Sequence, residues 1–492
     1  MKALLCSACF VAVPVSAQIP TFANADLVLG QPDFTTNTLR STSASSLEEP
    51  RDVVVDPATG KVFVVDRRRD RILRFASNDD LANNADAEAV FGRMDLDGNS
   101  LPGGRERSLN SPSSVALDSA GRLWVADTFH NRVLMFENAA NRVVVPGVAF
   151  LPDLVLGQAN LTDDSSQLTR TGMRSPSGVT VDDLGNLFVS DSSHNRILAF
   201  TDAANKTNGA PADAVYGQPD YMTDDSGRSA TALNGPRGLD RDANGTLWVA
   251  DIFNSRVLGF ETASGTLPNT VATRLLGQTS FTVRAQTTSA SGMSLCSDVY
   301  TDDLGALWVK DDQNNRVLRF NSVASKPNGG DADAVIGQSD FDSDDFGLAA
   351  NRLSSDRPLG GLSDGGLHVE ANGDLWVADA GNNRVLRFSR PRDPVVVADV
   401  TRPTIRVRGR KTIETLRKRV VFRGTAADAS GIARIEVRAR GAKVAKAKVR
   451  GGDRFKVVLR VRKDRGRVIV KLRAVDGVGL KSKRAKVRIL RR

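Results

Sequence analysis

Apolar and polar residues alternate along most of the chain in short runs, which are separated by Gly, Asn and Asp residues typical of turns. In the segment LWVADTFHNRVLMF (123–136), two apolar runs flank a short polar stretch, and close copies follow at 187–200 and 375–388. Alternation with a period of two between tight turns predicts antiparallel β-strands rather than amphipathic helices.

The same unit occurs six times. Its second predicted strand ends in an aspartate that recurs every 60 to 68 residues, at Asp66, Asp127, Asp191, Asp251, Asp311 and Asp379. Each unit also has an upstream strand such as SVALD (114–118) and a downstream strand such as LVLGQANL (154–161). Small four-stranded units bury their faces only against neighbouring units, so the pattern predicts an all-β, six-bladed β-propeller.

One extra copy of the downstream strand precedes the first unit. It lies at residues 27–34, whereas the sixth unit ends at Phe388 without such a strand. We therefore expect the N-terminal strand to complete the last blade. This pairing would close the ring and remove an open sheet edge.

The repeated pattern resembles a known family. The consensus V-x-x-D-x-x-G-x-L-W-V-A-D-x-x-N-x-R-V-L, as in residues 176–200 and 236–260, is similar to the NHL repeat, and the resemblance extends over residues 25–389. Secreted bacterial members of that family are similar in carrying a V-L-G-Q-x-D-F strand. The resemblance implies a six-bladed propeller at residues 18–389, but this scaffold hosts many activities.

The first seventeen residues differ from the rest. Lys2, an apolar run and the small residues before Gln18 are typical of a cleaved signal peptide at 1–17. The apolar run contains Pro14 and is short for a membrane-spanning helix. We expect a secreted, periplasmic or cell-surface protein with no transmembrane segment in its mature chain. Only Cys296 would then remain, so no intrachain disulfide could form.

The C-terminal part has a different charge from the predicted propeller. Residues 401–492 hold 32 Lys or Arg against 6 Asp or Glu (+26), whereas the other residues hold 35 against 51 (−16). Beyond a linker at 390–403, strands such as IARIEVRAR (432–440) and the turn in AADASG (426–431) resemble a bacterial Ig-like β-sandwich domain at 404–492.

A positive charge of this size favours an anionic surface polymer as partner. The candidate contacts lie on two predicted strands: Arg434, Arg438, Arg440, Lys471 and Arg473. Specific nucleic-acid recognition is not expected, because the ring is acidic and the chain carries a predicted signal peptide. The alternative is that arginine-rich composition merely fills solvated strand faces.

Two histidines occupy the turn after the repeated aspartate. His130 and His194 stand where other units have Asn254, Asn314 and Asn382. Since Asn and His tolerate left-handed backbone conformations, we interpret both as turn residues. The alternative is a zinc site, which would need both imidazoles within about 2.1 Å of one ion. The third histidine, His368, lies in the innermost strand of blade six and is not placed to join them.

Other polar groups have simpler interpretations. The pair Asp127 and Arg132 recurs in every unit, which favours a turn-bracing ion pair over a catalytic site. The stretch DLDGN (95–99) is similar to the start of a calcium loop but lacks the full ligand set. No catalytic or metal-binding residue is therefore predicted and no cofactor is expected, with a stabilising calcium as the alternative.

The ring end that carries the inter-blade loops is the predicted ligand surface, since loops there converge on the channel mouth. The candidates are Arg51, Arg67, Arg68, Phe129, His130, His194, Arg237 and Phe253. The main hypothesis is an exported, non-enzymatic binding or scaffold protein whose propeller recognises a glycan or protein, held to an anionic surface by the basic domain. One alternative is a propeller enzyme, a lyase or lactonase-like hydrolase, with a metal at the channel mouth. Another is a structural component of an envelope or extracellular matrix.

Overall fold

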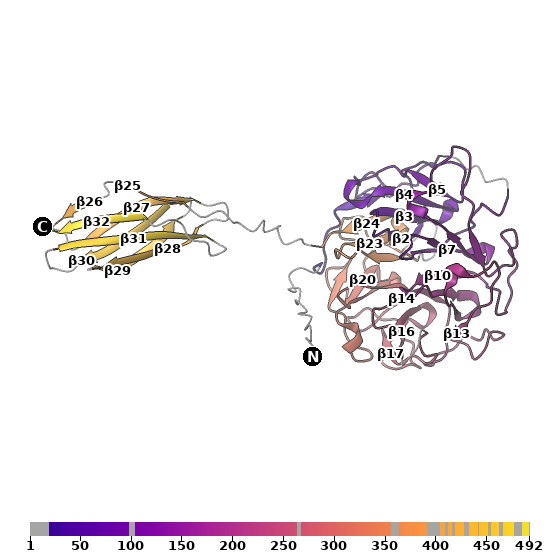
Figure 1. Ribbon diagram of the computed structural model, residues 1–492. Coiled ribbons are helices and arrows are strands. Elements are labelled where there is room, and N and C mark those ends of the chain that lie inside the picture. Colours follow the sequence, from indigo (N-terminus) through magenta and orange to yellow (C-terminus); the bar gives the residue numbers. More distant parts are fainter. Residues whose placement is uncertain are drawn as a thin grey trace, which may run out of the picture. The chain divides into compact units, whose positions relative to one another are not determined.

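The computed structural model describes residues 19–97, 104–262, 267–355 and 364–390, and eight strands within residues 404–491 (Figure 1). Among the side chains of these eight strands, only Lys471 and Leu472 are described. The predicted signal peptide and residues 391–403 of the predicted linker lie outside the described residues. The chain divides into two units, Met1–Pro391 and Arg392–Arg492. In the described part, no helix is long and apolar enough to cross a membrane.

The N-terminal unit contains six four-stranded antiparallel sheets. Blades 1 to 3 consist of β2 (Pro50–Val55), β3 (Lys61–Asp66), β4 (Arg71–Ser77) and β5 (Ala89–Phe91); β6 (Ser114–Leu117), β7 (Leu123–Asp127), β8 (Arg132–Phe136) and β9 (Leu154–Leu156); and β10 (Pro176–Val181), β11 (Leu187–Asp191), β12 (Arg196–Phe200) and β13 (Ala214–Tyr216).

Blades 4 to 6 consist of β14 (Pro236–Arg241), β15 (Leu247–Asp251), β16 (Arg256–Phe260) and β17 (Arg274–Leu276); β18 (Cys296–Thr301), β19 (Leu307–Asp311), β20 (Arg316–Phe320) and β21 (Ala334–Ile336); and β22 (Leu367–Val369), β23 (Leu375–Asp379), β24 (Arg384–Phe388) and β1 (Leu27–Leu29). Short 3₁₀ turns follow the second strand of each blade: η2 (Arg67–Arg69), η4 (Thr128–His130), η6 (Ser192–His194), η8 (Ile252–Asn254), η9 (Asp312–Asn314) and η11 (Ala380–Asn382). Others follow the third strand: η3 (Asn78–Asp80), η5 (Ala139–Asn141), η7 (Ala203–Asn205) and η10 (Val323–Ser325).

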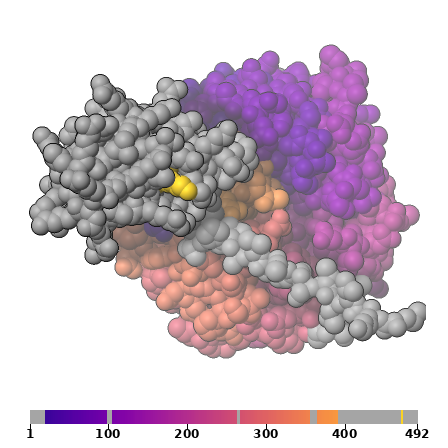
Figure 2. Space-filling view, turned by 60° about the vertical axis from the view of Figure 1, so that its left-hand side comes forward, coloured from indigo at the N-terminus to yellow at the C-terminus, as the bar shows by residue number. Residues whose placement is uncertain are grey.

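The blades follow one another around a ring in chain order, from indigo through magenta to orange (Figure 2). Their inner strands contact one another in the order β2, β6, β10, β14, β18 and β22, and β22 contacts β2 again. The predicted six-bladed propeller is therefore confirmed. Because the first strand of every blade faces the axis, six inner strands form the wall of a central channel.

The last blade closes as predicted. Strand β1 pairs antiparallel with β24, with Leu27 opposite Arg387 and Leu29 opposite Val385, in the sheet order β1-β24-β23-β22. Leu27, Val28 and Leu29 are buried. The N-terminal segment thus joins the two ends of the ring and gives blade six a fourth strand, so β24 is not an edge strand.

The core is divided among the blade interfaces. Six clusters of buried apolar side chains each join two neighbouring blades; one of them packs Trp376 and Leu29 of blade six against Val53 and Phe75 of blade one. Alternation along each strand directs side chains to both faces of a sheet, so every blade contributes to two clusters.

The C-terminal unit contains two four-stranded sheets, with orders β25-β27-β30-β29 and β26-β32-β31-β28. Their strands are β25 (Thr404–Arg408), β26 (Thr412–Thr415), β27 (Arg419–Ala427), β28 (Ile432–Arg440), β29 (Ala442–Arg450), β30 (Arg454–Val461), β31 (Gly466–Asp476) and β32 (Ala485–Arg491).

Candidate functional site

The repeated Asp–Arg pair is a structural brace in every blade. In blade two, the Arg132 Nε donates to the Asp127 Oδ2 at 2.7 Å, and both side chains are fully buried. The other Asp127 oxygen accepts the backbone N–H of Asn110, while the Arg132 guanidinium also donates to the Ser108 carbonyl. The equivalent pairs lie at 2.6 to 2.8 Å in the other blades. The predicted turn-bracing role is confirmed.

The two turn histidines belong to this brace. The His130 Nδ1 lies 2.9 Å from the Asp127 Oδ2, and His194 makes the same contact with Asp191. In other blades an asparagine side chain takes this place, as Asn254 does when it donates to Asp251 at 2.8 Å. Both histidines are buried and face their own turn rather than a ligand surface.

The physical reason given for these histidines from the sequence is wrong, although the turn location is right. His130 ends the 3₁₀ turn η4, and the left-handed residue is the next one, Asn131, with φ of 52°. His194 is likewise followed by the left-handed Asn195. The histidine is therefore placed there by its hydrogen bond to the buried aspartate and not by its tolerance of positive φ.

The remaining predicted candidates lie near the end of the channel where the inner strands begin, which we call the loop end. Arg67 and Arg68 pair with Glu49, and the Arg67 guanidinium lies 5.9 Å from the centre of the Phe129 ring. Phe129 and Phe253 are exposed, as expected for a surface that recognises a partner or packs against a loop.

At the loop end, two predicted arginines meet on one carboxylate. Arg51 of blade one and Arg237 of blade four each place an Nη1 atom 2.7 Å from the Asp364 Oδ2 of blade six. Burial opposes ionisation of Asp364, but the charges of Arg237 and Arg51 outweigh it, so the pKa of this carboxyl is well below its usual value. The cluster joins three blades across the ring. Little space is left around it, a cavity of about 30 Å³.

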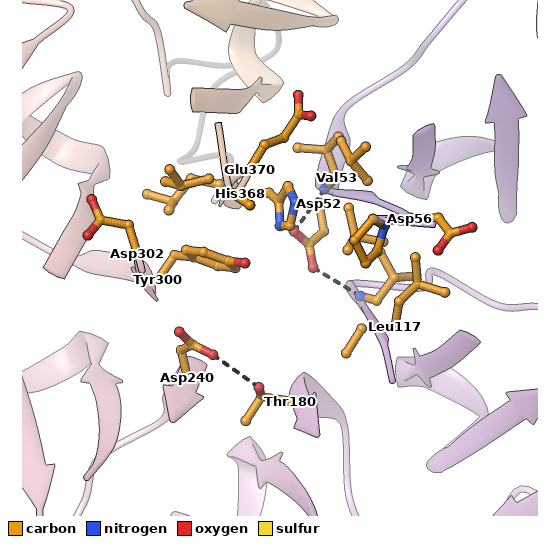
Figure 3. Close-up of a pocket in the computed structure, with 18 of the residues that line it drawn as sticks. Asp52, Val53, Asp56, Leu117, Thr180, Asp240, Tyr300, Asp302, His368 and Glu370 are labelled. Carbon is orange, nitrogen blue, oxygen red and sulfur yellow. Dashed lines mark hydrogen bonds between the residues drawn. The ribbon is translucent and has the colours of Figure 1, made fainter. Parts of the chain in front are cut away.

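The larger cavity occupies the opposite half of the channel, which we call the cavity end. It has a volume of about 720 Å³ and extends from Asp52 and Asp298 to the turns after the inner strands (Figure 3). One side of its wall is apolar, with Val54, Leu117 and Val181. The ligand surface predicted from the sequence lies at the loop end, so that prediction missed this cavity.

Two carboxyls, the buried Asp52 and the partly buried Asp298, form the floor of the cavity. The Asp52 oxygens accept the backbone N–H groups of Val53 at 2.8 Å and Val115 at 2.9 Å. Burial raises the pKa of Asp52 to about 7 in spite of these hydrogen bonds. Asp298 accepts the backbone N–H of Leu367 at 2.8 Å, and burial together with the charge of Asp52 raises its pKa well above the usual value.

Asp240 and Tyr300 form the wall above this floor. One Asp240 oxygen accepts the Thr301 backbone N–H at 2.7 Å, and the other accepts the Thr180 hydroxyl at 3.2 Å. Burial raises the pKa of Asp240 to about 6. Burial also raises the pKa of Tyr300, and the charge of Asp240 adds to this effect, so the phenol stays protonated. Its side chain points into the cavity (Figure 3).

His368 completes the wall from blade six. Its ring meets the Tyr300 ring edge to face, with centroids 4.9 Å apart. Burial lowers the pKa of His368 to about 3, so the imidazole is neutral at ordinary pH. Among the described residues, neither the His368 ring nor the Tyr300 hydroxyl makes a hydrogen bond, and both are free to contact a ligand in the cavity.

A signal for this site was present in the sequence. The middle residues of the six inner strands occupy equivalent positions: Val54, Ala116, Thr180, Asp240, Tyr300 and His368. Elsewhere in the unit, buried positions repeat the same residue type. This position is apolar in blades one and two, but it carries a carboxyl, a phenol and an imidazole in blades four, five and six. Packing alone does not require such variation.

The cavity side chains do not fit a metal ion. Within the described ranges, no three His, Cys, Asp or Glu side chains come together in an arrangement that could hold one. In the proposed calcium stretch, Asp97 accepts the backbone N–H of Ala44 at 3.1 Å, and Asn99 lies outside the described residues. We therefore derive no chemical step through a metal.

The predicted polyanion contacts lie on adjacent strands of the C-terminal unit. In the backbone register of β28 and β31, Arg438 lies opposite Lys471 and Glu436 lies opposite Arg473. The Lys471 side chain is exposed. The side chains of Arg434, Arg438, Arg440 and Arg473 lie outside the described part of the structure.

The fold and its channel define a six-bladed β-propeller, and the chain contains NHL repeats: the family model "NHL repeat" matches residues 109–136 and 173–200. No curated protein matches the sequence. Similar solved structures include virginiamycin B lyase from Staphylococcus aureus, at 12% identity and a TM-score of 0.39 over 69% of this chain and 94% of that one.

Two further similar structures are also named as enzymes. A putative gluconolactonase is 13% identical, with a TM-score of 0.38 over 75% of this chain and 98% of that one. A luciferin-regenerating enzyme is 12% identical, with a TM-score of 0.38 over 70% and 92% of the two chains. These neighbours are named as enzymes, contrary to the non-enzymatic binding function that we expected from the sequence, and we do not propose that function further. Likeness at this level carries no argument about this chain's own chemistry, which we take from the channel.

Proposed function

We propose that the propeller is an enzyme that performs acid–base chemistry on a small carbonyl compound bound in the channel cavity. One observation carries the proposal: titratable groups that are not part of the repeat, Asp52, Asp240, Tyr300 and His368, line one cavity from four different blades. Perturbed titratable groups gathered in a concave site are typical of active sites.

Asp52 is the proposed proton acceptor. A pKa of about 7 is close to the value at which a group both accepts and returns protons efficiently at neutral pH. Each Asp52 oxygen accepts one backbone hydrogen bond, which fixes its orientation and leaves a lone pair for the substrate or for a water molecule.

Tyr300 is the proposed hydrogen-bond donor. Its hydroxyl remains protonated and points into the cavity, where it can donate to a carbonyl oxygen that gains negative charge during the reaction. The neutral imidazole of His368 and the carboxyl of Asp240, whose pKa is raised, provide further proton donors and acceptors on this side of the wall. Both hydrolysis of a lactone or ester and elimination next to a carbonyl need this pair of roles.

The test is turnover by the full chain with two substrate classes, aryl lactones or esters and β-acyloxy carbonyl compounds. Oxygen-18 from water enters the acid product only in hydrolysis, whereas elimination creates a conjugated alkene that absorbs ultraviolet light. We expect Asp52→Asn to lower kcat by about 10² to 10⁴-fold and Tyr300→Phe by a comparable factor. Asp163→Asn, an exposed change outside the cavity, is the matched control. Turnover of neither class, or equal turnover by Asp52→Asn and the control, would contradict the proposal.

We also propose that the C-terminal unit is an Ig-like domain that contacts an anionic polymer in an exported protein. The charge of +26 on residues 401–492 and the placement of Arg438 opposite Lys471 support this, since like charges in a cross-strand pair repel unless an anion lies near them. The test is retention of the full chain on immobilised heparin. A variant with Arg434, Arg438 and Arg440 changed to Glu should elute from heparin at lower salt than the wild type. Elution at an unchanged salt concentration would refute the contact.

A further inference from the structure

Carboxyl groups line the cavity along its whole length. Among the described residues that line it, nine carry carboxyl groups and none is a lysine or arginine. The nine are Asp52, Asp56, Asp79, Asp183, Asp240, Asp298, Asp302, Asp303 and Glu370. Some of these only brace the fold: Asp302 accepts the Trp308 indole N–H at 2.9 Å, and Glu370 accepts that of Trp376 at 2.6 Å.

Three carboxylates have no such role, and they lie where the cavity opens at the cavity end, which we call the mouth of the cavity. Asp79, Asp183 and Asp303 are exposed, and in the described part of the chain none of them forms an ion pair or a side-chain hydrogen bond. They come from blades one, three and five, so they surround the opening. Carboxylates around a cleft with low-dielectric walls concentrate cations at its entrance.

The interior also offers contacts suited to a cation. The Tyr300 ring has a negative face, Asp240 supplies a carboxyl beside it, and the buried His368 ring presents nitrogens without a hydrogen-bond partner among the described residues. An ammonium group is attracted both to aromatic faces and to carboxylates. The apolar wall formed by Val54, Leu117 and Val181 suits the uncharged part of the same molecule.

The opposite end of the channel has the reverse charge. Arg51 and Arg237 share the single carboxylate of Asp364, and the Nε atoms of both arginines are buried without a hydrogen-bond partner. The charge along the channel axis therefore changes from negative at the cavity end to positive at the loop end. The two arginines would repel from the far end a cation that entered past Asp183 and Asp303, so the cavity would hold it.

We propose that the cavity binds an organic cation, and that the substrate of the enzyme is a small molecule with an ammonium group. The ammonium group lies against Tyr300 and Asp240, and the apolar part lies against the wall of blades one to three. That the bound cation is also a substrate rests on the proposed function. Binding of the cation does not depend on turnover.

The experiment measures binding of benzyltrimethylammonium to the full chain by isothermal titration calorimetry, with benzyl alcohol as the uncharged analogue. We expect the cation to bind at least about tenfold more tightly than the alcohol at low salt, and the difference to shrink as salt screens the charges. Two triple variants lose the same charge at opposite ends of the channel: Asp79, Asp183 and Asp303→Asn at the mouth, and the exposed Asp163, Asp224 and Asp344→Asn in the inter-blade loops. The mouth variant should bind the cation about tenfold more weakly, whereas the loop variant should bind it as the wild type does.

Equal affinity for the cation and the alcohol, or an equal loss in the two triple variants, would overturn the proposal. So would the absence of any cation binding. The variant Tyr300→Phe separates this inference from the proposed function, because it keeps the aromatic ring and removes the hydroxyl. It should bind the cation normally while losing turnover. In the wild type, turnover without cation binding would refute the inference alone, and cation binding without turnover would refute the proposed function alone.

Discussion

The turns after the second strands carry the same pair of residues in every blade, whereas the residues that form the wall of the channel differ from blade to blade. In all six turns an aspartate pairs with an arginine five residues later, as Asp127 does with Arg132, and both are buried. The inner strands keep one backbone geometry but vary in their middle residue, from Val54 to Asp240 and Tyr300. The repeated residues hold the ring together, whereas the unrepeated ones give the larger channel cavity its chemical character.

The comparison separates two uses of a buried carboxylate. Asp127 receives a guanidinium and a backbone N–H, which satisfy its charge within the blade. Among the described residues, Asp52 receives only backbone and hydroxyl hydrogen bonds, so burial raises its pKa to about 7. A buried carboxylate with a cationic partner stays ionised and can stabilise the fold. A buried carboxyl without such a partner has a raised pKa and can take part in proton transfer.

The largest effect should come from breaking the ring itself. Deletion of residues 25–34 removes Leu27, Val28 and Leu29 from the core and exposes the edge of β24. Burial of three such side chains is worth about 5 kcal/mol or more, so the melting temperature of the propeller should fall sharply. Calorimetry measures the change, with Leu39→Ser, an exposed position just beyond the deleted segment, as the control. A deletion mutant that melts like the control would show that β1 does not close the ring.

A smaller but still large effect should follow from removing one brace. Arg132→Met leaves the buried Asp127 carboxylate without its cation, which should destabilise the propeller by about 3 to 5 kcal/mol. Because the brace is repeated, Arg196→Met in blade three should behave similarly. Urea unfolding monitored by tryptophan fluorescence provides the free energies. Loss of less than about 1 kcal/mol in both variants would mean that the pair is not structural.

The turn histidine should give the smallest of the three effects. His130→Asn keeps a hydrogen bond to Asp127, as Asn254 does in blade four, and should be nearly neutral. His130→Val removes that bond to a buried charge and should cost about 1.5 to 3 kcal/mol. The same unfolding assay compares the two variants. Equal stability would indicate that the Nδ1 contact contributes nothing.

The sequence predicted the blades, the closing strand and the braces because each depends on a pattern within one repeat or on a count of repeats. Strand β1, for example, follows from one extra V-L-G-Q copy before blade one. The cavity depends instead on side chains from blades one, four, five and six, and nothing local to Asp52 indicates that Tyr300 or His368 will share its cavity. The left-handed position predicted at His130 lies one residue later, at Asn131, because turn residues of similar type stand side by side in the sequence.

Asp52 holds its proton to near-neutral pH because it is buried in the channel without a cationic partner among the described residues. In the unfolded chain this carboxyl loses its proton near pH 4, whereas in the fold its pKa is about 7, so the native state binds the extra proton between these values. Stability contributed by this group is therefore present at low pH and is lost as pH rises from about 4 to 7, with a slope of at most about 1.4 kcal/mol per pH unit.

The decisive measurement is the unfolding free energy of the wild type and of Asp52→Asn across pH 4.5 to 8. Asparagine carries no ionisable proton, so the variant should lose stability relative to the wild type at low pH and should recover or exceed it above pH 7. Parallel curves for the two proteins over the whole range would contradict the claim, because Asp52 would then titrate as an ordinary aspartate.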